Sequence, residues 1–252
     1  MKKTMDNQSI ISIKIPKTKM ISIFASSFFF FIIAFVLWKQ QRIDVATVLM
    51  HNCVYENESL FEFLKVVSRF GMGFISLIYC LAIFLSFRKD ELDLNKPLFL
   101  YIIFAFAFGS ITGDLMKELF TRTRPAVLLA GQIHNSVISD SFSFPSGHAT
   151  KSMSLALPFI LMASKKSTIN RILKIILLLS SILVCYSRIA LQRHFPSDIF
   201  AGVAVALLAV VIGHWIVNYV YKRRMFDEDK LQSLSFKLCF VFIALAILLS
   251  II

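Results

Sequence analysis

Three residues with catalytic potential, Arg188, His194 and Asp198, lie close together in the chain between two apolar segments. Pro196 can occupy the first turn of the second segment, because its missing N–H would be unpaired there anyway. His194 would then lie just outside a helix and Asp198 about one turn inside it. A carboxylate beside one ring nitrogen fixes the tautomer and leaves the other nitrogen free as a nucleophile. Arg188 adds a planar fork that suits phosphate oxygens.

A second group of hydrogen-bond donors precedes these residues: Lys117, Arg124 and the tripeptide Ser146-Gly147-His148. Gly147 permits close backbone approach, and the free amides at a helix start attract an anion. The Ser146 hydroxyl can add another donor. Together these groups fit one phosphoryl group. A metal site would need several Asp, Glu or His ligands, and there are too few acids, so we expect no metal and no cofactor.

These residues occur in three linked motifs. The motifs are Lys117-x6-Arg124-Pro125, Pro145-Ser146-Gly147-His148 and Ser187-Arg188-x5-His194-x3-Asp198. In this order and spacing they resemble the signature of the type 2 phosphatidic acid phosphatase superfamily, which also contains bacterial acid phosphatases and vanadium haloperoxidases. The resemblance covers about Pro97 to Tyr221, with no departure at the signature positions.

The resemblance implies a role for each position. His194 would attack phosphorus and form a phosphohistidine, Asp198 would orient it, and His148 would act as general acid and then as general base. Five further positions would bind the phosphate: Lys117, Arg124, Ser146, Gly147 and Arg188. The resemblance also implies the family fold, an all-helical bundle whose site lies at the extracytoplasmic surface of the membrane.

Three more basic residues near these motifs lie outside the signature: Arg122, Lys151 and Arg193. We expect them as secondary contacts to a second phosphate or a lipid headgroup. The alternative is that they cover a solvated face of the protein. If they do contact substrate, they favour a substrate with more than one phosphate, such as a lipid pyrophosphate or lipid A.

The composition is that of a membrane protein. The chain has 252 residues, of which 57% are hydrophobic, and a mean hydropathy of +0.74, which is too apolar for a soluble domain of this size. The net charge of +12 comes mostly from short loops between apolar runs, which is typical of membrane orientation and not of nucleic-acid binding. The four cysteines include no C-x-x-C pair and predict neither disulfides nor a zinc site.

The apolar runs predict an all-α, polytopic membrane helix bundle that forms a single domain, residues 1–252, with its signature-bearing core at about 97–221. We expect six core spans and a seventh at the C-terminus: Met20–Trp38, Phe70–Phe87, Pro97–Met116, His148–Ala163, Arg171–Tyr186, Ile199–Tyr221 and Ser235–Ile252.

The distribution of Lys and Arg orients this bundle. With a cytoplasmic N-terminus, the cytoplasmic side has the N-terminal segment, the loops after the second, fourth and sixth spans, and Lys237. Together these hold most of the Lys and Arg residues, as the positive-inside rule expects. The signature residues then share one basic pocket at the extracytoplasmic ends of the third to sixth spans. The residue usage is typical of bacteria, so we expect a multi-pass protein of the bacterial cytoplasmic (inner) membrane whose site faces the periplasm or cell exterior.

We therefore expect an integral membrane lipid phosphatase, with lipid A or undecaprenyl pyrophosphate as its substrate. Phosphatidylglycerol phosphate and phosphatidate are alternative substrates. A lipid phosphotransferase could use the same site, while a non-catalytic lipid-phosphate carrier is disfavoured by the intact His148, His194 and Asp198. A haloperoxidase is disfavoured because those family members are soluble. The partners expected are the bilayer and its lipid phosphate, with no nucleic acid and no obligate protein partner.

Overall fold

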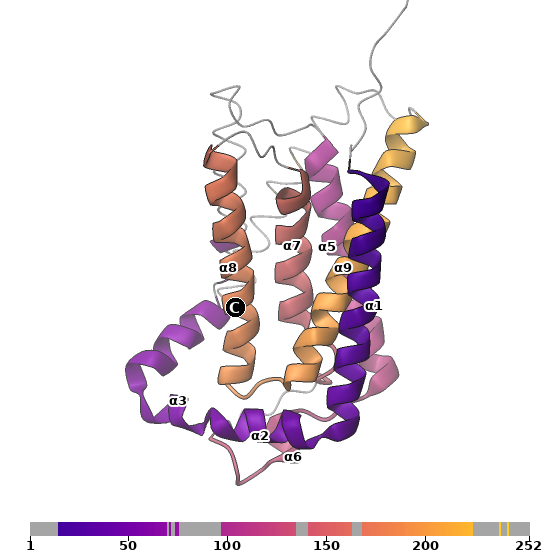
Figure 1. Ribbon diagram of the computed structural model, residues 1–252. Helices are drawn as coiled ribbons and strands as arrows, with labels where there is room; N and C mark the ends of the chain where they lie inside the picture. The colour runs from indigo at the N-terminus through magenta and orange to yellow at the C-terminus, as the bar shows by residue number, and fades with distance from the viewer. Residues whose placement is uncertain are drawn as a thin grey trace, which may run out of the picture.

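The computed structural model describes residues 15–69, 71, 74–75, 97–134, 141–162, 168–223, 237 and 241, and every regular element in these ranges is a helix. Five long helices run side by side (Figure 1). They are α1 (Lys17–Gln40), α5 (Pro97–Phe120), α7 (Gly147–Met162), α8 (Thr168–Ala190) and α9 (Pro196–Lys222). Short helices α2 (Arg42–Met50), α3 (Asn52–Glu56) and α6 (Pro125–Leu128) lie across one end of the bundle.

Helix α9 is the central helix, in contact with α1, α5 and α7. Its buried face is rich in alanine and glycine, which lets the neighbouring backbones come close. A Cβ on Gly202 would lie 2.7 Å from the Ser146 carbonyl oxygen at the start of α7, and one on Gly213 would lie 3.2 Å from the Ala105 amide of α5. Glycine at these two positions therefore sets how closely α9 approaches its neighbours.

Four stretches of the described chain are long and apolar enough to cross a bilayer. They are Lys17–Gln40, Leu100–Leu128, Thr168–Ala190 and Pro196–Lys222. Most of the surface of α1 and α8 carries exposed large apolar side chains, such as Phe28 and Leu179. A bilayer covers such surfaces, so this is the architecture of a multi-pass membrane protein.

The five predicted spans that fall on described residues occupy the same positions as α1, α5, α7, α8 and α9, although the helices extend further at several ends. Helix α5 continues to Phe120 instead of stopping at Met116, and α8 continues to Ala190 instead of Tyr186. The span expected at Phe70–Phe87 lies outside the described residues except for 71, 74 and 75, and the span expected at Ser235–Ile252 lies outside them except for 237 and 241. The expected six core spans and seventh span stay a prediction.

The chain turns sharply after α1, and the turn brings the N-terminal segment across the end of the bundle. Gln41, between α1 and α2, has a positive φ of 26°, and α2 then lies across the end of the bundle (Figure 1). Residues 58–69 are also helical. The buried side chain of Leu64 in this segment clusters with Ala190 and Leu191 at the end of α8. Helices α2 and α3 therefore lie at the same end of the bundle as the junction between α8 and α9.

Candidate active site

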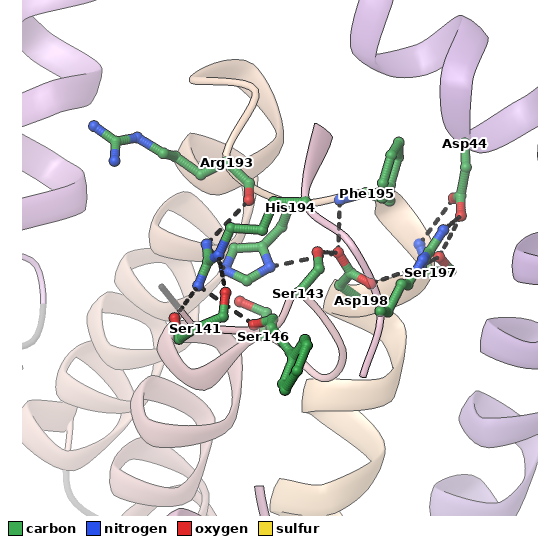
Figure 2. A network of polar contacts seen from close by, with 12 residues as sticks. Asp44, Ser141, Ser143, Ser146, Arg193, His194, Phe195, Ser197 and Asp198 are labelled. Atoms are coloured by element: carbon green, nitrogen blue, oxygen red, sulfur yellow. Dashed lines mark hydrogen bonds and ion pairs between the residues drawn. The ribbon is translucent and has the colours of Figure 1, made fainter. Parts of the chain in front are cut away.

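His194 and Asp198 meet at the junction of α8 and α9, as the spacing predicts. Pro196 is the first residue of α9, and the Asp198 carboxylate turns back to accept a hydrogen bond from the Phe195 amide at 2.9 Å. The same oxygen, Oδ2, lies 3.4 Å from Nδ1 of His194 (Figure 2). The other ring nitrogen, Nε2, lies 3.4 Å from Nη1 of Arg124. One nitrogen of the imidazole, Nδ1, therefore faces a carboxylate, and the other, Nε2, faces a cation.

Burial keeps this imidazole neutral. The side chain of His194 is 2% exposed, and loss of hydration lowers its pKa from 6.5 to about 4, although the Asp198 carboxylate opposes this shift. Arg188 and Arg124 lower the pKa further by their positive charge. A neutral imidazole keeps its lone pair, so His194 can act as a nucleophile at neutral pH.

The Asp198 carboxylate is held from several sides. Its Oδ1 accepts a hydrogen bond from Nη1 of Arg122 at 2.6 Å, and its Oδ2 accepts one from the Ser143 hydroxyl. Asp198 is fully buried. A buried carboxylate with this many donors has a fixed orientation, and so it fixes the ring beside it.

Arg124 is positioned by the loop that leads into α7. Its Nε and Nη2 donate to the carbonyl and the hydroxyl of Ser141, each at 2.7 Å. Its Nη1 also lies 3.3 Å from the carbonyl oxygen of Arg193. These contacts hold the guanidinium beside Nε2 of His194, where it can stabilise an anion that approaches the ring.

The start of α7 is joined directly to α9, because the Ser146 amide donates to the Asp198 carbonyl oxygen at 2.9 Å. A Cβ on Gly147 would lie 3.3 Å from Nζ of Lys117, so the ammonium group lies against the bare glycine backbone. The Ser146 hydroxyl is buried and has no hydrogen-bond partner among the described residues. An unpaired buried hydroxyl is costly, so this group suits a ligand that supplies an acceptor.

Arg188 and His148 complete the group. The Arg188 Nη1 donates to the Ser68 hydroxyl, while its Nε has no partner in the described part of the chain. The His194 ring and the cationic side chains of Arg188, Lys151 and Lys117 lie near His148. The ends of α5, α7, α8 and α9 thus bring all eight signature residues into one basic site.

Residues 98–225 match the sequence profile of the PAP2 superfamily. The chain belongs to this superfamily. An undecaprenyl-diphosphatase from Sulfolobus acidocaldarius is 22% identical over 175 residues, which cover 69% of this chain and 74% of that protein.

A solved structure shares the PAP2 fold. The crystal structure of a transmembrane PAP2 type phosphatidylglycerolphosphate phosphatase from Bacillus subtilis superposes with a TM-score of 0.60 at 22% identity. The match covers 79% of this chain and 96% of that one. The resemblance found in the motifs is therefore confirmed, and the fold is that of a membrane PAP2 protein.

The three basic residues outside the PAP2 signature lie in different surroundings. Arg122, expected as a secondary substrate contact, is instead buried and paired with Asp44 and Asp198; this expectation was wrong, because its guanidinium is enclosed by carboxylates and aromatic rings. The side chain of Arg193 points away from the imidazole (Figure 2). Lys151 is partly exposed one turn beyond His148. Lys151 and Arg193 stay candidate headgroup contacts.

Four residues of the site lie outside the PAP2 motifs and are not predicted from the sequence: Asp44, Ser68, Ser143 and Ser197. Asp44 could have been found from the sequence, because it is an acid among the apolar residues of α2 and a buried acid needs a partner. The serines could not, because serine is common in loops and at helix ends.

A separate cavity of about 250 Å³ lies beside this network. Trp38, Phe120, Phe195, Asp44 and Arg122 are among its lining residues, and no PAP2 signature residue lines it. It is therefore distinct from the space in front of Nε2.

The described residues contain no group of three or more His, Cys, Asp or Glu side chains arranged to hold a metal ion. Lys117, Arg124 and Arg188 are cationic and suit an anion instead. Metal independence stays a prediction.

Proposed function

We propose that the chain is an integral membrane lipid phosphatase that hydrolyses a phosphate ester or pyrophosphate of a membrane lipid through a phosphohistidine. The observation that carries this proposal is the placement of His194. Its Nδ1 lies 3.4 Å from the Asp198 carboxylate, and its Nε2 faces Arg124 at the same distance. A buried, neutral imidazole between a carboxylate and an anion-binding cation is suited to attack phosphorus.

In the first step Nε2 of His194 attacks phosphorus, and the bond from phosphorus to the leaving oxygen breaks. His148 gives a proton to that oxygen, which leaves as a lipid alcohol or, from a pyrophosphate, as the lipid monophosphate. The proton on Nδ1 stays directed toward Asp198. The cations and the Ser146 hydroxyl stabilise the charge that spreads over the three equatorial oxygens.

In the second step His148 takes a proton from a water molecule, and the resulting hydroxide attacks phosphorus. The bond from phosphorus to nitrogen breaks, inorganic phosphate leaves, and His194 returns to its neutral form. His148 is again protonated, so the cycle closes without a metal. If a lipid hydroxyl replaced water in this step, the same site would act as a phosphotransferase.

A lipid substrate suits the position of the site, because the phosphate can reach the cations at the bundle end while the hydrocarbon chains stay in the bilayer. We place undecaprenyl pyrophosphate first, and the support for it is the similarity to the undecaprenyl-diphosphatase from Sulfolobus acidocaldarius. Lipid A, phosphatidylglycerol phosphate and phosphatidate are the other candidates. We place the site on the extracytoplasmic face of a bacterial cytoplasmic membrane, with the N-terminus inside, on the charge asymmetry of the loops.

The test is phosphate release by the purified full-length protein in detergent micelles with EDTA present. We expect release from undecaprenyl pyrophosphate at a higher kcat/KM than from lipid A, phosphatidylglycerol phosphate or phosphatidate. We expect His194→Ala to be inactive and to form no phosphoprotein with radiolabelled substrate. His214→Ala is the matched control, because His214 contacts Asn218 elsewhere on α9. Full turnover by His194→Ala, or cleavage of soluble monophosphates alone, would overturn the proposal.

A further inference from the structure

Asp44 is a fully buried acid from the N-terminal segment, well before the PAP2 region of the chain. Its Oδ1 accepts a hydrogen bond from the Ser197 amide at 3.0 Å, in the first turn of α9. Its Oδ2 accepts hydrogen bonds from the Ser197 hydroxyl and, at 2.7 Å, from Nη2 of Arg122. Figure 2 shows Asp44 reaching from its helix toward Ser197. Asp44 therefore contacts the same turn that carries Asp198.

Arg122 links the two acids. Its Nη2 binds Asp44 and its Nη1 binds Asp198 at 2.6 Å. The guanidinium lies over the rings of Phe195 and Trp38, at 4.4 Å and 5.3 Å from their centroids. The arginine side chain is only 7% exposed, so solvent screens these charges little. The charge on each acid therefore affects the other through a fixed bridge.

The negative charge of Asp44 changes the net charge of the group of side chains beside His194. Arg122 and Asp198 alone would form a neutral pair, and a neutral pair attracts a positive imidazole weakly. With Asp44 present, the three groups carry a net charge of about −1 beside His194. That charge matters because the ring becomes positive when it binds phosphorus, and Arg124 and Arg188 both oppose a positive ring.

We propose that Asp44 is a positioning residue for the reaction: it balances the charge of Arg122, so that Arg122 can orient Asp198 without cancelling the negative charge that Asp198 presents to His194. The role rests on the proposed function, since it concerns the phosphohistidine step. Among the described residues, the hydrogen bonds and ion pair of Asp44 go to Arg122 and Ser197, and none goes to His194 or to a phosphate-binding residue.

A purely structural role would be that Asp44 docks α2 onto α9. The chain offers a control for this, because Asn52 of α3 docks the same segment onto the same junction. The Gln192 side chain donates to Oδ1 of Asn52 at 2.6 Å and to the Val48 carbonyl oxygen at 3.2 Å. No hydrogen bond or ion pair of Asn52 reaches Asp198 among the described residues. Asn52→Ala therefore weakens docking and leaves the charge balance intact.

The experiment compares Asp44→Asn with Asn52→Ala in the full-length protein, by lipid phosphate release and by thermal unfolding. Asn keeps the shape of Asp and an acceptor for the Ser197 amide, but removes the charge. We expect Asp44→Asn to lower kcat about ten- to a hundredfold with KM nearly unchanged, the size of effect that follows from weakening one charged contact to a developing charge. We expect Asn52→Ala to change kcat less than about threefold.

Two further measurements separate the outcomes. In an Arg122→Gln background, Asp44→Asn should lower kcat little further, because the charge that it balances is gone. NMR titration of the His194 ring, in protein labelled at histidine, needs no turnover. The charged and titratable groups that face this ring are Asp198, Arg124, Arg188 and His148. Removing the Asp44 charge should lower the pKa of His194 below its wild-type value.

The possible results are distinct. Equal loss of kcat in Asp44→Asn and Asn52→Ala, or additive effects with Arg122→Gln, would overturn the positioning role. An unchanged His194 titration in folded Asp44→Asn would overturn it as well. If the wild-type protein released no phosphate from any lipid, the proposed function would fail while the titration still tested the charge balance.

Discussion

Gly202→Ala tests whether the contact between α9 and α7 sets the geometry of the site. The added Cβ would lie 2.7 Å from the Ser146 carbonyl oxygen and 2.9 Å from the Ala149 Cβ. Neither neighbouring atom is the end of a flexible side chain, and the Ser146 carbonyl already accepts the first hydrogen bond of α7, from the Thr150 amide, at 3.0 Å. The start of α7 must therefore move away from α9.

The size of the movement follows from the contact. Ordinary van der Waals contact begins near 3.4 Å, so the Ser146 carbonyl must retreat by about 0.7 Å. Overpacking of this kind costs about 1–3 kcal/mol of stability. A misplacement near 1 Å in a catalytic group can lower the rate up to about a hundredfold. We expect kcat to fall about tenfold to a hundredfold, because Ser146, Gly147 and His148 move together relative to His194.

Gly213→Ala is the matched control. It lies on the same helix, and its Cβ would lie 3.2 Å from the Ala105 amide, which requires a shift of only about 0.2 Å at a contact with α5. Both variants are assayed for phosphate release and thermal unfolding. We expect Gly213→Ala to alter stability while kcat stays near the wild-type value. Wild-type kcat in a folded Gly202→Ala protein, or an equal loss in Gly213→Ala, would refute the reasoning.

Two further predictions concern the imidazole and the phosphate cradle. Because the pKa of His194 is lowered from 6.5 to about 4, protonation of this ring should decrease kcat/KM only as the pH falls toward 4. The free energy of unfolding should decrease as the pH falls from 6.5 to 4, because the unfolded chain takes up the proton first. A His194 titration near pH 6.5 by NMR would contradict both expectations. Ser146→Ala should raise KM about tenfold without loss of thermal stability, because its hydroxyl has no hydrogen-bond partner in the described part of the chain before substrate binds. Ser154→Ala removes another buried hydroxyl of α7 for which those residues supply no partner, and it should leave KM unchanged. The same KM in both variants would contradict a role in phosphate binding.

The local geometry of the site could be predicted from the sequence because it is encoded by short spacings. Pro196 starts α9, and Asp198 falls one turn inside it, so its return toward His194 follows from helix geometry alone. The apolar runs place Lys117 and Gly147 near helix ends, although α5 continues to Phe120, past the end at Met116 that its apolar run predicts. These features depend on neighbours within a few residues.

The surroundings of Arg122 could not be predicted in this way. Its partners, Asp44 and Asp198, lie 78 and 76 positions away in the chain, and no local pattern states which distant acid meets a given arginine. From the sequence, an arginine two residues before Arg124 is expected to be another phosphate contact, because basic side chains bind phosphate oxygens. Its burial depends on how α2 crosses the bundle, which follows from the turn at Gln41.

The contact between Asp44 and the first turn of α9 has a consequence for exchanging parts between relatives. A chimera that joined residues 98–225 of this chain to the N-terminal helices of another protein would keep every signature residue. It would nevertheless lose the acceptor for the Ser197 amide and one of the two acids on Arg122. The segment that must be transferred as a unit is therefore longer than the three signature motifs, and it begins no later than α2, the helix that carries Asp44.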